Sequence, residues 1–222
     1  MASELIQGSE QGNHITKHRI GCCLLAVTSS GRRLAQENPQ LLRWFQNYRK
    51  SAEGKLPSFG NQGHYRRFKA LGCEGQVFQL GVSEDQKQIA VKEYHSTPAR
   101  PVVETLRRME DLRIACEGIP SVRVATHYAA ADFDRDKSGL TKQVLVMEHV
   151  DGPTVEQVLE NRDLSLSARQ NVYDAFIEIS HTMVGLLGPR NQTHLFGDWG
   201  TRNVIVEPQP IGRPTRLCVI DQ

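Results

Sequence analysis

The sequence LFGDWGTRNVIV, residues 195–206, decides the fold expected for this chain. It contains an acid, Asp198, then four residues, then Asn203 and an apolar strand. A loop of this length can turn the carboxylate toward an attacking hydroxyl while the asparagine oxygen reaches a metal ion. Taken alone, the pattern is more typical of a polar turn that leads into a strand.

A second apolar strand, further along the chain, favours the functional interpretation. Residues 217–220 read LCVI and are followed by Asp221, which can bring a second carboxylate next to the first loop. A hard Mg²⁺ ion bound to phosphates requires oxygen ligands of this kind. We therefore predict that Asn203 and Asp221 hold the metal ion and that Asp198 orients the acceptor hydroxyl and accepts its proton.

Two signals upstream become informative only together. Residues 71–78, LGCEGQVF, form a G-x-x-G-x-V strand-turn-strand, in which Gly72 and Gly75 let backbone N–H groups approach a polyphosphate. The next predicted strand, residues 88–94, reads QIAVKEY and places Lys92 among apolar neighbours, where it could fix the α- and β-phosphates. A single strand lysine more commonly points into solvent, and most glycine pairs in hairpins are plain turns.

A cleft lysine needs a carboxylate partner, because an unpaired ammonium is costly and mobile there. Residues 101–117 are predicted to form a helix, and its apolar face contains Val103, Leu106, Glu110 and Ile114. Glu110 is the favoured partner of Lys92. Glu104 is the alternative, although it lies beside Arg108 and Asp111 on the face expected to meet solvent.

These pieces occur in the order of the protein-kinase-like superfamily, which the chain resembles over about residues 66–222. Residues 146–152, VMEHVDG, resemble the kinase hinge, whose backbone would bind adenine around Glu148 and Val150 behind the limiting Met147. The Gly197-Asp198…Asn203 phrase resembles aminoglycoside phosphotransferases and lipopolysaccharide kinases more than eukaryotic protein kinases. The resemblance implies ATP and Mg²⁺ as cofactors, with nucleotide or metal contacts from Gly72, Gly75, Val77, Ala90, Lys92, Met147, Glu148, Val150, Asn203 and Asp221.

Several positions depart from the family pattern. Phe196 stands where His or Tyr is usual, Gly197 replaces the arginine used in activation-loop control, and Gln222 follows Asp221 in place of Phe-Gly. The resemblance therefore does not predict control through activation-loop phosphorylation. The sequence ends at this point, which leaves two alternatives: a fragment of a longer polypeptide, or a minimal kinase like those among bacterial secreted effectors.

Strands first and helices later predict an α+β fold, and the resemblance implies a two-lobed protein-kinase-like fold with an incomplete C-terminal lobe. We expect an N-terminal extension at residues 1–65, a kinase N-lobe at 66–147 and a partial C-lobe at 148–222 that ends at the metal-binding Asp221. The extension reads as weakly ordered or separately packed, with a short helix at Asn38 to Tyr48. The remaining predicted elements are strands at 122–131 and 143–150, helices at 154–160 and 167–187, the second mostly buried, and a hairpin of 203–207 with 216–220.

Composition excludes several other classes. The 27 Lys and Arg residues nearly balance 25 Asp and Glu residues, without a long basic block, so nucleic acid is not an expected partner. Five scattered cysteines without a C-x-x-C pair favour a reducing cytoplasm over a disulfide framework or a zinc site. No apolar run is long enough to span a bilayer, and residues 1–12 do not form a cleavable secretory signal. A secreted effector would act in the host cell.

The predicted partners are ATP, an unidentified hydroxyl-bearing protein or small molecule, and a protein partner for the N-terminal extension. Two rival interpretations stay open. One is a pseudokinase that uses the fold as a nucleotide-gated or partner-binding module. The other is a truncated, inactive piece whose N-terminal extension is an interaction element.

Overall fold

The computed structural model describes residues 15–20, 23–37, 65–71, 75–81, 88–94, 102–133, 143–195, 200–209 and 215–220. The fold is mixed, with helices and two β-sheets, and the chain divides into two compact units. The first unit contains residues up to Glu110 together with Thr126–His149, and the second contains Asp111–Ala125 and the residues from Val150 onward. The predicted lobes, residues 66–147 and 148–222, have other bounds than these units, because residues 111–125 belong to the second unit. The lobe ranges therefore stay a prediction.

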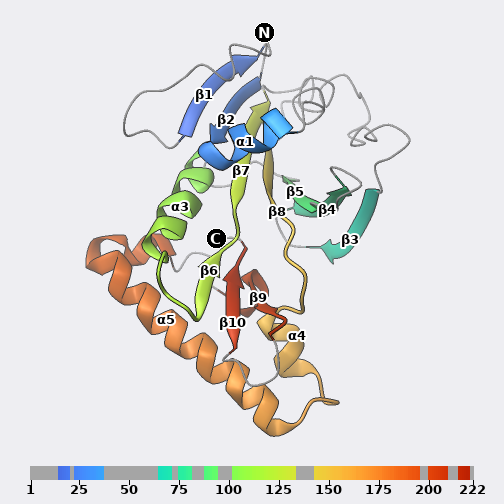
Figure 1. Cartoon of the computed structure of the whole chain (residues 1–222), viewed down its shortest axis with the longest axis vertical. Helices are drawn as coiled ribbons and strands as arrows, with labels where there is room; N and C mark the ends of the chain where they lie inside the picture. Colours follow the sequence, from blue (N-terminus) through green and yellow to red (C-terminus); the bar gives the residue numbers. More distant parts are fainter. Residues whose placement is uncertain are drawn as a thin grey trace. The chain divides into compact units, whose positions relative to one another are not determined.

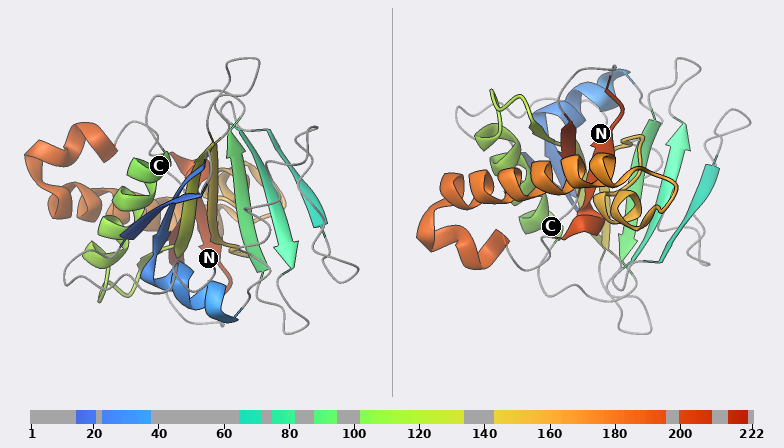
Figure 2. Two further views of the ribbon diagram at one scale, coloured as in Figure 1. Left: turned by 90° about the horizontal axis from the view of Figure 1, so that it is seen from above. Right: turned by 90° about the horizontal axis from the view of Figure 1, so that it is seen from below.

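One antiparallel sheet forms the first unit, and Figure 2 shows its strands side by side. Each strand continues the ladder of its neighbour, so backbone N–H and C=O groups along the sheet are paired. In spatial order the strands are β1 (Ile15–Ile20), β2 (Cys23–Thr28), β7 (His127–Phe133), β8 (Gln143–Glu148), β5 (Gln88–Tyr94), β4 (Gly75–Gly81) and β3 (Tyr65–Leu71).

Helix α3 (Val102–Ala115) supplies the apolar face that covers this sheet. Its residues Val102, Val103 and Leu106 join a buried cluster with Ala26, Ala90, Tyr94, Ala130, Leu145 and Met147 from four strands. Ile114, predicted on the same face, is instead 38% exposed. The helix ends at Ala115, and the turn that follows contains Gly118, whose φ of +91° suits glycine.

Residues 15–20 and 23–37, which lie in the predicted N-terminal extension, are part of the sheet of the first unit and its adjoining helix. Strand β2 pairs with β7, and α1 (Ser29–Glu37) follows it directly and contacts both strands (Figure 1). The apolar run LLAV at Leu24–Val27 lies in β2, and Leu25, Ala26 and Val27 are buried. Thr28 begins α1: its hydroxyl accepts from the Gly31 N–H at 3.0 Å and donates to the His127 carbonyl at 2.8 Å. The helix predicted at Asn38 to Tyr48 lies outside the described residues.

A smaller sheet forms the second unit. Strand β10 (Arg216–Val219) lies in its centre, parallel to β6 (Val122–Val124) and antiparallel to β9 (Val204–Glu207). The predicted β9–β10 hairpin is therefore confirmed as a pair of strands. Helices α4 (Val155–Glu160) and α5 (Leu166–Leu195) complete the unit (Figure 1).

Two predicted elements of this region differ from the structure. The single strand predicted at 122–131 is two strands, β6 and β7, which belong to different sheets and separate at Ala125–Thr126. Helix α5 is longer than predicted, and its described side chains are not mostly buried. Val172, Ile179 and Met183 form one buried stripe, whereas Leu166 is 73% exposed and Tyr173 46% exposed, as in an amphipathic helix.

Asp132 of β7 attaches the start of α3 to the sheet. Its carboxylate accepts a hydrogen bond from the Val102 N–H, which caps the helix from a neighbouring strand. Asp132 also lies directly opposite Gln143 in the β7–β8 register. Within the described chain, Asp132 Oδ1 and Gln143 Oε1 are both buried acceptors without a hydrogen-bond donor. Burial therefore raises the pKa of Asp132 above its ordinary value of 3.8, against the smaller opposing effect of the Val102 hydrogen bond.

Replacing Asp132 with asparagine is expected to remove a pH dependence of stability. The folded wild-type protein holds the proton of Asp132 more tightly than the unfolded chain, so its free energy of unfolding falls as the pH rises from about 4 toward neutrality. Asparagine keeps the cap and offers an N–H donor toward Gln143, so Asp132→Asn is expected to be more stable by about 1 kcal/mol at pH 7 and by less near pH 4. Denaturant titrations at both pH values measure this, with exposed Asp163→Asn as control. Equal pH profiles for Asp132→Asn and wild type would contradict it.

Candidate functional site

Lys92 lies in the apolar interior of the first unit. Lys92 is only 9% exposed. The residues two positions before and after it on the strand, Ala90 and Tyr94, belong to the buried apolar cluster. The Lys92 Nζ lies 4.6 Å from the centre of the Tyr94 ring, within the range of a cation–π interaction. The alternative of a lysine that points into solvent is therefore wrong.

The two candidate partners of this lysine, Glu110 and Glu104, differ in their burial. Glu110 is 3% exposed and follows Leu106 by one turn of α3, on the face that packs on the sheet. The Glu104 side chain is 39% exposed and forms an ion pair with Arg108 at 3.3 Å. Among the residues that the structure describes, Lys92 and Glu110 are the only buried side chains that carry opposite formal charges. Buried charges of opposite sign are stable when they compensate each other.

Three apolar residues predicted to contact the nucleotide pack on one core. Val77, Ala90 and Met147 belong to the same apolar cluster, Val77 at its edge. The strand register explains this arrangement, because Val77 pairs with Lys92 and Ala90 pairs with Met147. Side chains of directly paired residues lie on the same face of a sheet. The first unit therefore brings together Lys92 and the apolar residues that were predicted to contact a nucleotide.

The structure explains why position 75 requires a glycine, which the sequence alone did not. A Cβ atom at this position would lie 2.4 Å from the Glu93 carbonyl oxygen of the neighbouring strand. The glycine is thus required by the close approach of β4 and β5, whether or not a phosphate binds nearby. Gly72, its predicted companion, lies outside the described residues.

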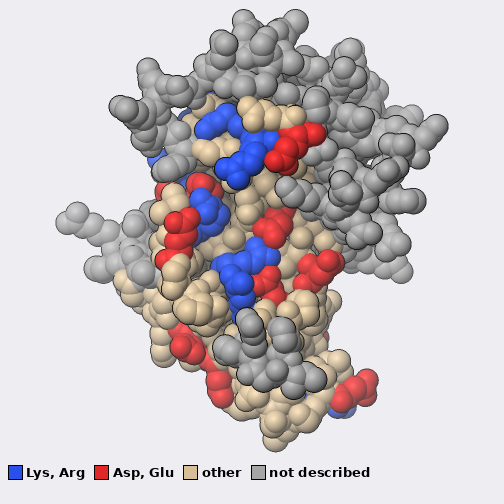
Figure 3. Space-filling view, in the orientation of Figure 1, with Lys and Arg blue, Asp and Glu red and all other residues tan. Residues whose placement is uncertain are grey.

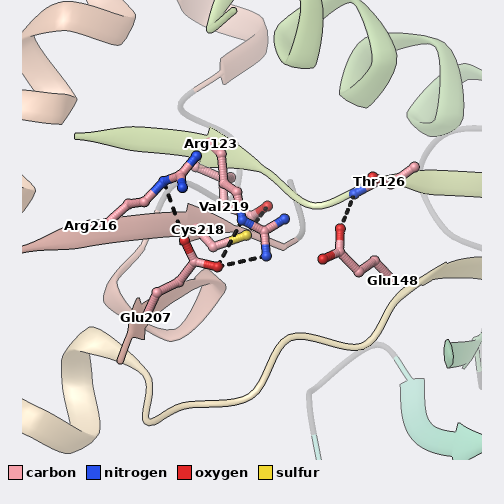
Figure 4. Close-up of polar contacts among 7 residues, drawn as sticks. All are labelled: Arg123, Thr126, Glu148, Glu207, Arg216, Cys218 and Val219. Atoms are coloured by element: carbon pink, nitrogen blue, oxygen red, sulfur yellow. Dashed lines mark hydrogen bonds and ion pairs between the residues drawn. The ribbon is translucent and has the colours of Figure 1, made fainter. Parts of the chain in front are cut away.

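Glu148 joins the end of β8 to the residue that precedes β7. Its carboxylate accepts from the Thr126 N–H at 3.0 Å (Figure 4). The Glu148 N–H also donates to the Thr126 carbonyl at 2.8 Å. An adenine contact from Glu148 would therefore come through its carbonyl oxygen. Val150, the other predicted hinge residue, belongs to the second unit and is buried there with Ala125, Ile205 and Cys218.

Asn203 ends the short 3-10 helix η2 (Thr201–Asn203), immediately before β9. Its N–H donates to the Gly200 carbonyl at 3.0 Å, and its carbonyl accepts from the Ile220 N–H at 2.9 Å. Ile220 directly precedes Asp221 in the sequence. The main chain of the predicted metal ligand Asn203 is therefore held next to the approach to the second predicted ligand. Asp198 and Asp221 themselves lie outside the described residues.

The donor set fits a hard divalent cation. Asn203 and Asp221 carry the amide and carboxylate oxygens that Mg²⁺ prefers as ligands, and the Asn203 carbonyl accepts a hydrogen bond from Ile220, the residue that precedes Asp221 in the sequence. The described residues contain no cluster of three His, Cys, Asp or Glu side chains that could hold a metal by itself.

Sequence reasoning missed an ion pair beside this loop. Arg202 of η2 donates from Nε to both carboxylate oxygens of Glu156 in α4, at 2.8 and 3.0 Å. The two residues are 46 positions apart, and no local pattern connects them. The position of Arg202 immediately before Asn203 was the one available signal.

A second polar cluster ties the three strands of the small sheet together. Glu207 of β9 binds Arg123 of β6 through Nε at 2.8 Å, and its other oxygen lies 3.5 Å from Arg216 of β10 (Figure 4). Glu207 is the third residue after Val204 in β9, so it lies about 10 Å further along the strand. On the face seen in Figure 3, basic and acidic side chains of the described residues alternate. This mixture agrees with the balanced charge of the sequence.

Cys116 is buried between α3 and α5 and donates from Sγ to Met183 Sδ at 3.5 Å. Burial raises the pKa of this thiol to about 11. At neutral pH it is therefore an unreactive thiol.

Comparisons with known proteins add little. No protein-family model matches the chain, and no curated protein matches it. Among solved structures, the chain is similar to WaaP in complex with acyl carrier protein, with 17% sequence identity and a TM-score of 0.44. The match covers 72% of this chain and 61% of that chain, so this chain spans less than two thirds of that protein. A likeness at this level does not assign a function.

None of the helices in the described part of the chain is both long enough and apolar enough to cross a membrane.

Proposed function

We propose that this chain is an ATP-dependent phosphotransferase with a protein-kinase-like fold, which transfers the γ-phosphate of ATP to a hydroxyl group of a protein or small molecule. The observation that carries the proposal is the hydrogen bond from the Ile220 N–H to the Asn203 carbonyl. It joins the D-x-x-x-x-N loop to the strand that leads to Asp221, as a two-ligand Mg²⁺ site requires.

The first unit supports the same proposal independently. A glycine-bearing hairpin, β3–β4, is followed by a strand with a buried lysine and then by a helix with a buried glutamate. In protein kinases a glycine-rich loop covers the phosphates, and a strand lysine is held by a glutamate of the next helix. The sheet order β4-β5-β8 places the lysine strand between that hairpin and the predicted hinge strand.

Each residue has one role in the proposed reaction. Lys92 binds the α- and β-phosphates, and Glu110 holds Lys92. Asp198 orients the acceptor hydroxyl and takes its proton, while Asn203 and Asp221 hold the Mg²⁺ of the bound nucleotide. The chemistry that a bound Mg²⁺ supplies is neutralisation of charge on the phosphate oxygens. Phosphoryl transfer asks mainly for positioning and charge compensation, which these groups supply.

The test is transfer of labelled phosphate from ATP to added acceptors, with hydrolysis to water measured in parallel. We expect activity in the wild type and in the exposed control Asp163→Ala, and loss of activity in Asp198→Ala and Asp221→Ala. Equal activity in all four proteins would remove the assignment. Nucleotide affinity measured on the same samples identifies the rival, because Mg²⁺·ATP binding without turnover in the wild type would favour a pseudokinase.

A further inference from the structure

The ion pair between Arg202 and Glu156 connects the metal-binding end of the D-x-x-x-x-N loop to a helix. Arg202 is the residue before Asn203, and its Nε contacts both oxygens of the Glu156 carboxylate. Both residues belong to the second unit, so this contact lies within one compact body.

Helix α4 is itself firmly attached to β9, the strand that follows the loop. The Thr154 hydroxyl caps the helix by accepting from the Gln157 N–H at 3.2 Å, and the Gln157 side chain accepts from the Thr154 N–H at 2.9 Å. Thr154 forms a β-bridge with Ile205. The Val206 N–H donates to the Pro153 carbonyl at 2.9 Å. Glu156 therefore approaches Arg202 from a fixed platform.

The pair is too exposed to contribute much to folding. The Arg202 side chain is 76% exposed and that of Glu156 is 30% exposed, and ion pairs of this kind stabilise proteins only weakly. Its geometry is nevertheless specific, because one N–H is shared between two oxygens at 2.8 and 3.0 Å. The Glu156 carboxylate also lies in the first turn of α4, where the helix dipole favours a negative charge.

We infer that Glu156 is a positioning residue: through Arg202 it restrains the turn that presents the Asn203 side chain to the metal ion. The inference rests on the proposed function for its catalytic meaning, but the restraint itself is a property of the fold. Hydrogen bonds to Gly200 and Ile220 fix the main chain of Asn203. The ion pair with Glu156 adds a restraint on Arg202, the residue directly before Asn203.

Hydrogen exchange tests the restraint without any assumption about activity. In the Glu156→Gln variant of this chain, the amides of Asn203 and Ile220 are expected to exchange about two- to fivefold faster than in the wild type, which is the range expected for the loss of an exposed ion pair. Glu160→Gln changes the same residue type further along the same helix and is the matched control, expected to exchange as the wild type does. Unchanged exchange in Glu156→Gln would overturn the inference.

A Mg²⁺ titration tests its meaning for the reaction. With ATP saturating, Glu156→Gln and Arg202→Gln are each expected to raise the Mg²⁺ concentration for half-maximal transfer about two- to fivefold, with little change in melting temperature. The double variant is expected to be no worse than either single variant, because both remove one interaction. Multiplying effects in the double variant would overturn the positioning role. A wild type without transfer activity would instead contradict the proposed function and leave the exchange result to decide the restraint.

Discussion

Replacing Lys92 with methionine is expected to lower the rate of phosphate transfer about 100- to 1,000-fold, the usual loss when a preorganised charge at a reacting group is removed. Methionine fills a similar volume in the apolar surroundings of Ala90 and Tyr94 but cannot hold the α- and β-phosphates. Transfer of labelled phosphate under saturating Mg²⁺·ATP measures the loss.

The same substitution separates chemistry from stability. Lys92→Met leaves the carboxylate of Glu110, which is 3% exposed, without its proposed cation, and breaking a buried pair in this way costs about 3–5 kcal/mol. Adding Glu110→Met replaces the whole pair with apolar side chains, which is often neutral for stability. The double variant is therefore expected to regain stability while it stays inactive.

Glu104 provides the matched control for this cycle. Its ion pair with Arg108 is an i,i+4 pair on the solvent side of α3, so Glu104→Met is expected to cost less than about 0.5 kcal/mol. It should not rescue Lys92→Met. If the losses of Lys92→Met and Glu110→Met simply add, the two side chains do not form a pair, and the assignment of Glu110 is wrong.

Local sequence patterns predicted individual elements well. The run QIAVKEY predicts a strand, and the structure has β5 at Gln88–Tyr94. A helix was also predicted at 154–160, and α4 spans Val155–Glu160 with Thr154 as its cap. Both signals depend only on neighbours in the chain, which is why they could be read directly.

Pairing between distant segments could not be predicted. The run at Leu24–Val27 is too short and too uniformly apolar to show which strand it joins, and β7 is more than 100 residues away. The break at Ala125–Thr126 is invisible for a similar reason, because both sides favour a strand. Tertiary contacts decided these elements.

For the candidate site, too, some features could be predicted from the sequence and others are known only from the structure. Residue types and their order predicted Lys92, Glu110 and Asn203, but only burial distinguishes Glu110 from Glu104 and a core lysine from a surface one. The reason for Gly75 is a carbonyl of the neighbouring strand, and the partner of Arg202 is a helix residue far away in sequence. Spacing alone contains neither fact.

Gly152→Ala is expected to be the most destabilising small substitution in the second unit. The glycine has a φ of +139°, and a Cβ atom there would lie 2.4 Å from the Val206 carbonyl oxygen and 2.9 Å from Ile205. These atoms belong to β9, which pairs with the adjoining segment through Pro153 and Thr154 and cannot move away cheaply. Backbone strain and overpacking together are expected to lower the free energy of unfolding by about 2–4 kcal/mol.

Two other glycines of the same unit separate these causes. Gly118 also has a positive φ, +91°, but an added Cβ would meet nothing within 4 Å, so Gly118→Ala tests backbone strain alone. Gly185 lies in α5 with open space around it, and Gly185→Ala is expected to stabilise the protein by about 0.5–1 kcal/mol through helix propensity. Denaturant midpoints should therefore rank Gly185→Ala highest, then wild type, Gly118→Ala and Gly152→Ala. A Gly152→Ala protein as stable as Gly118→Ala would mean that the segment before α4 does not approach β9 this closely, and the platform proposed for Glu156 would lose its support.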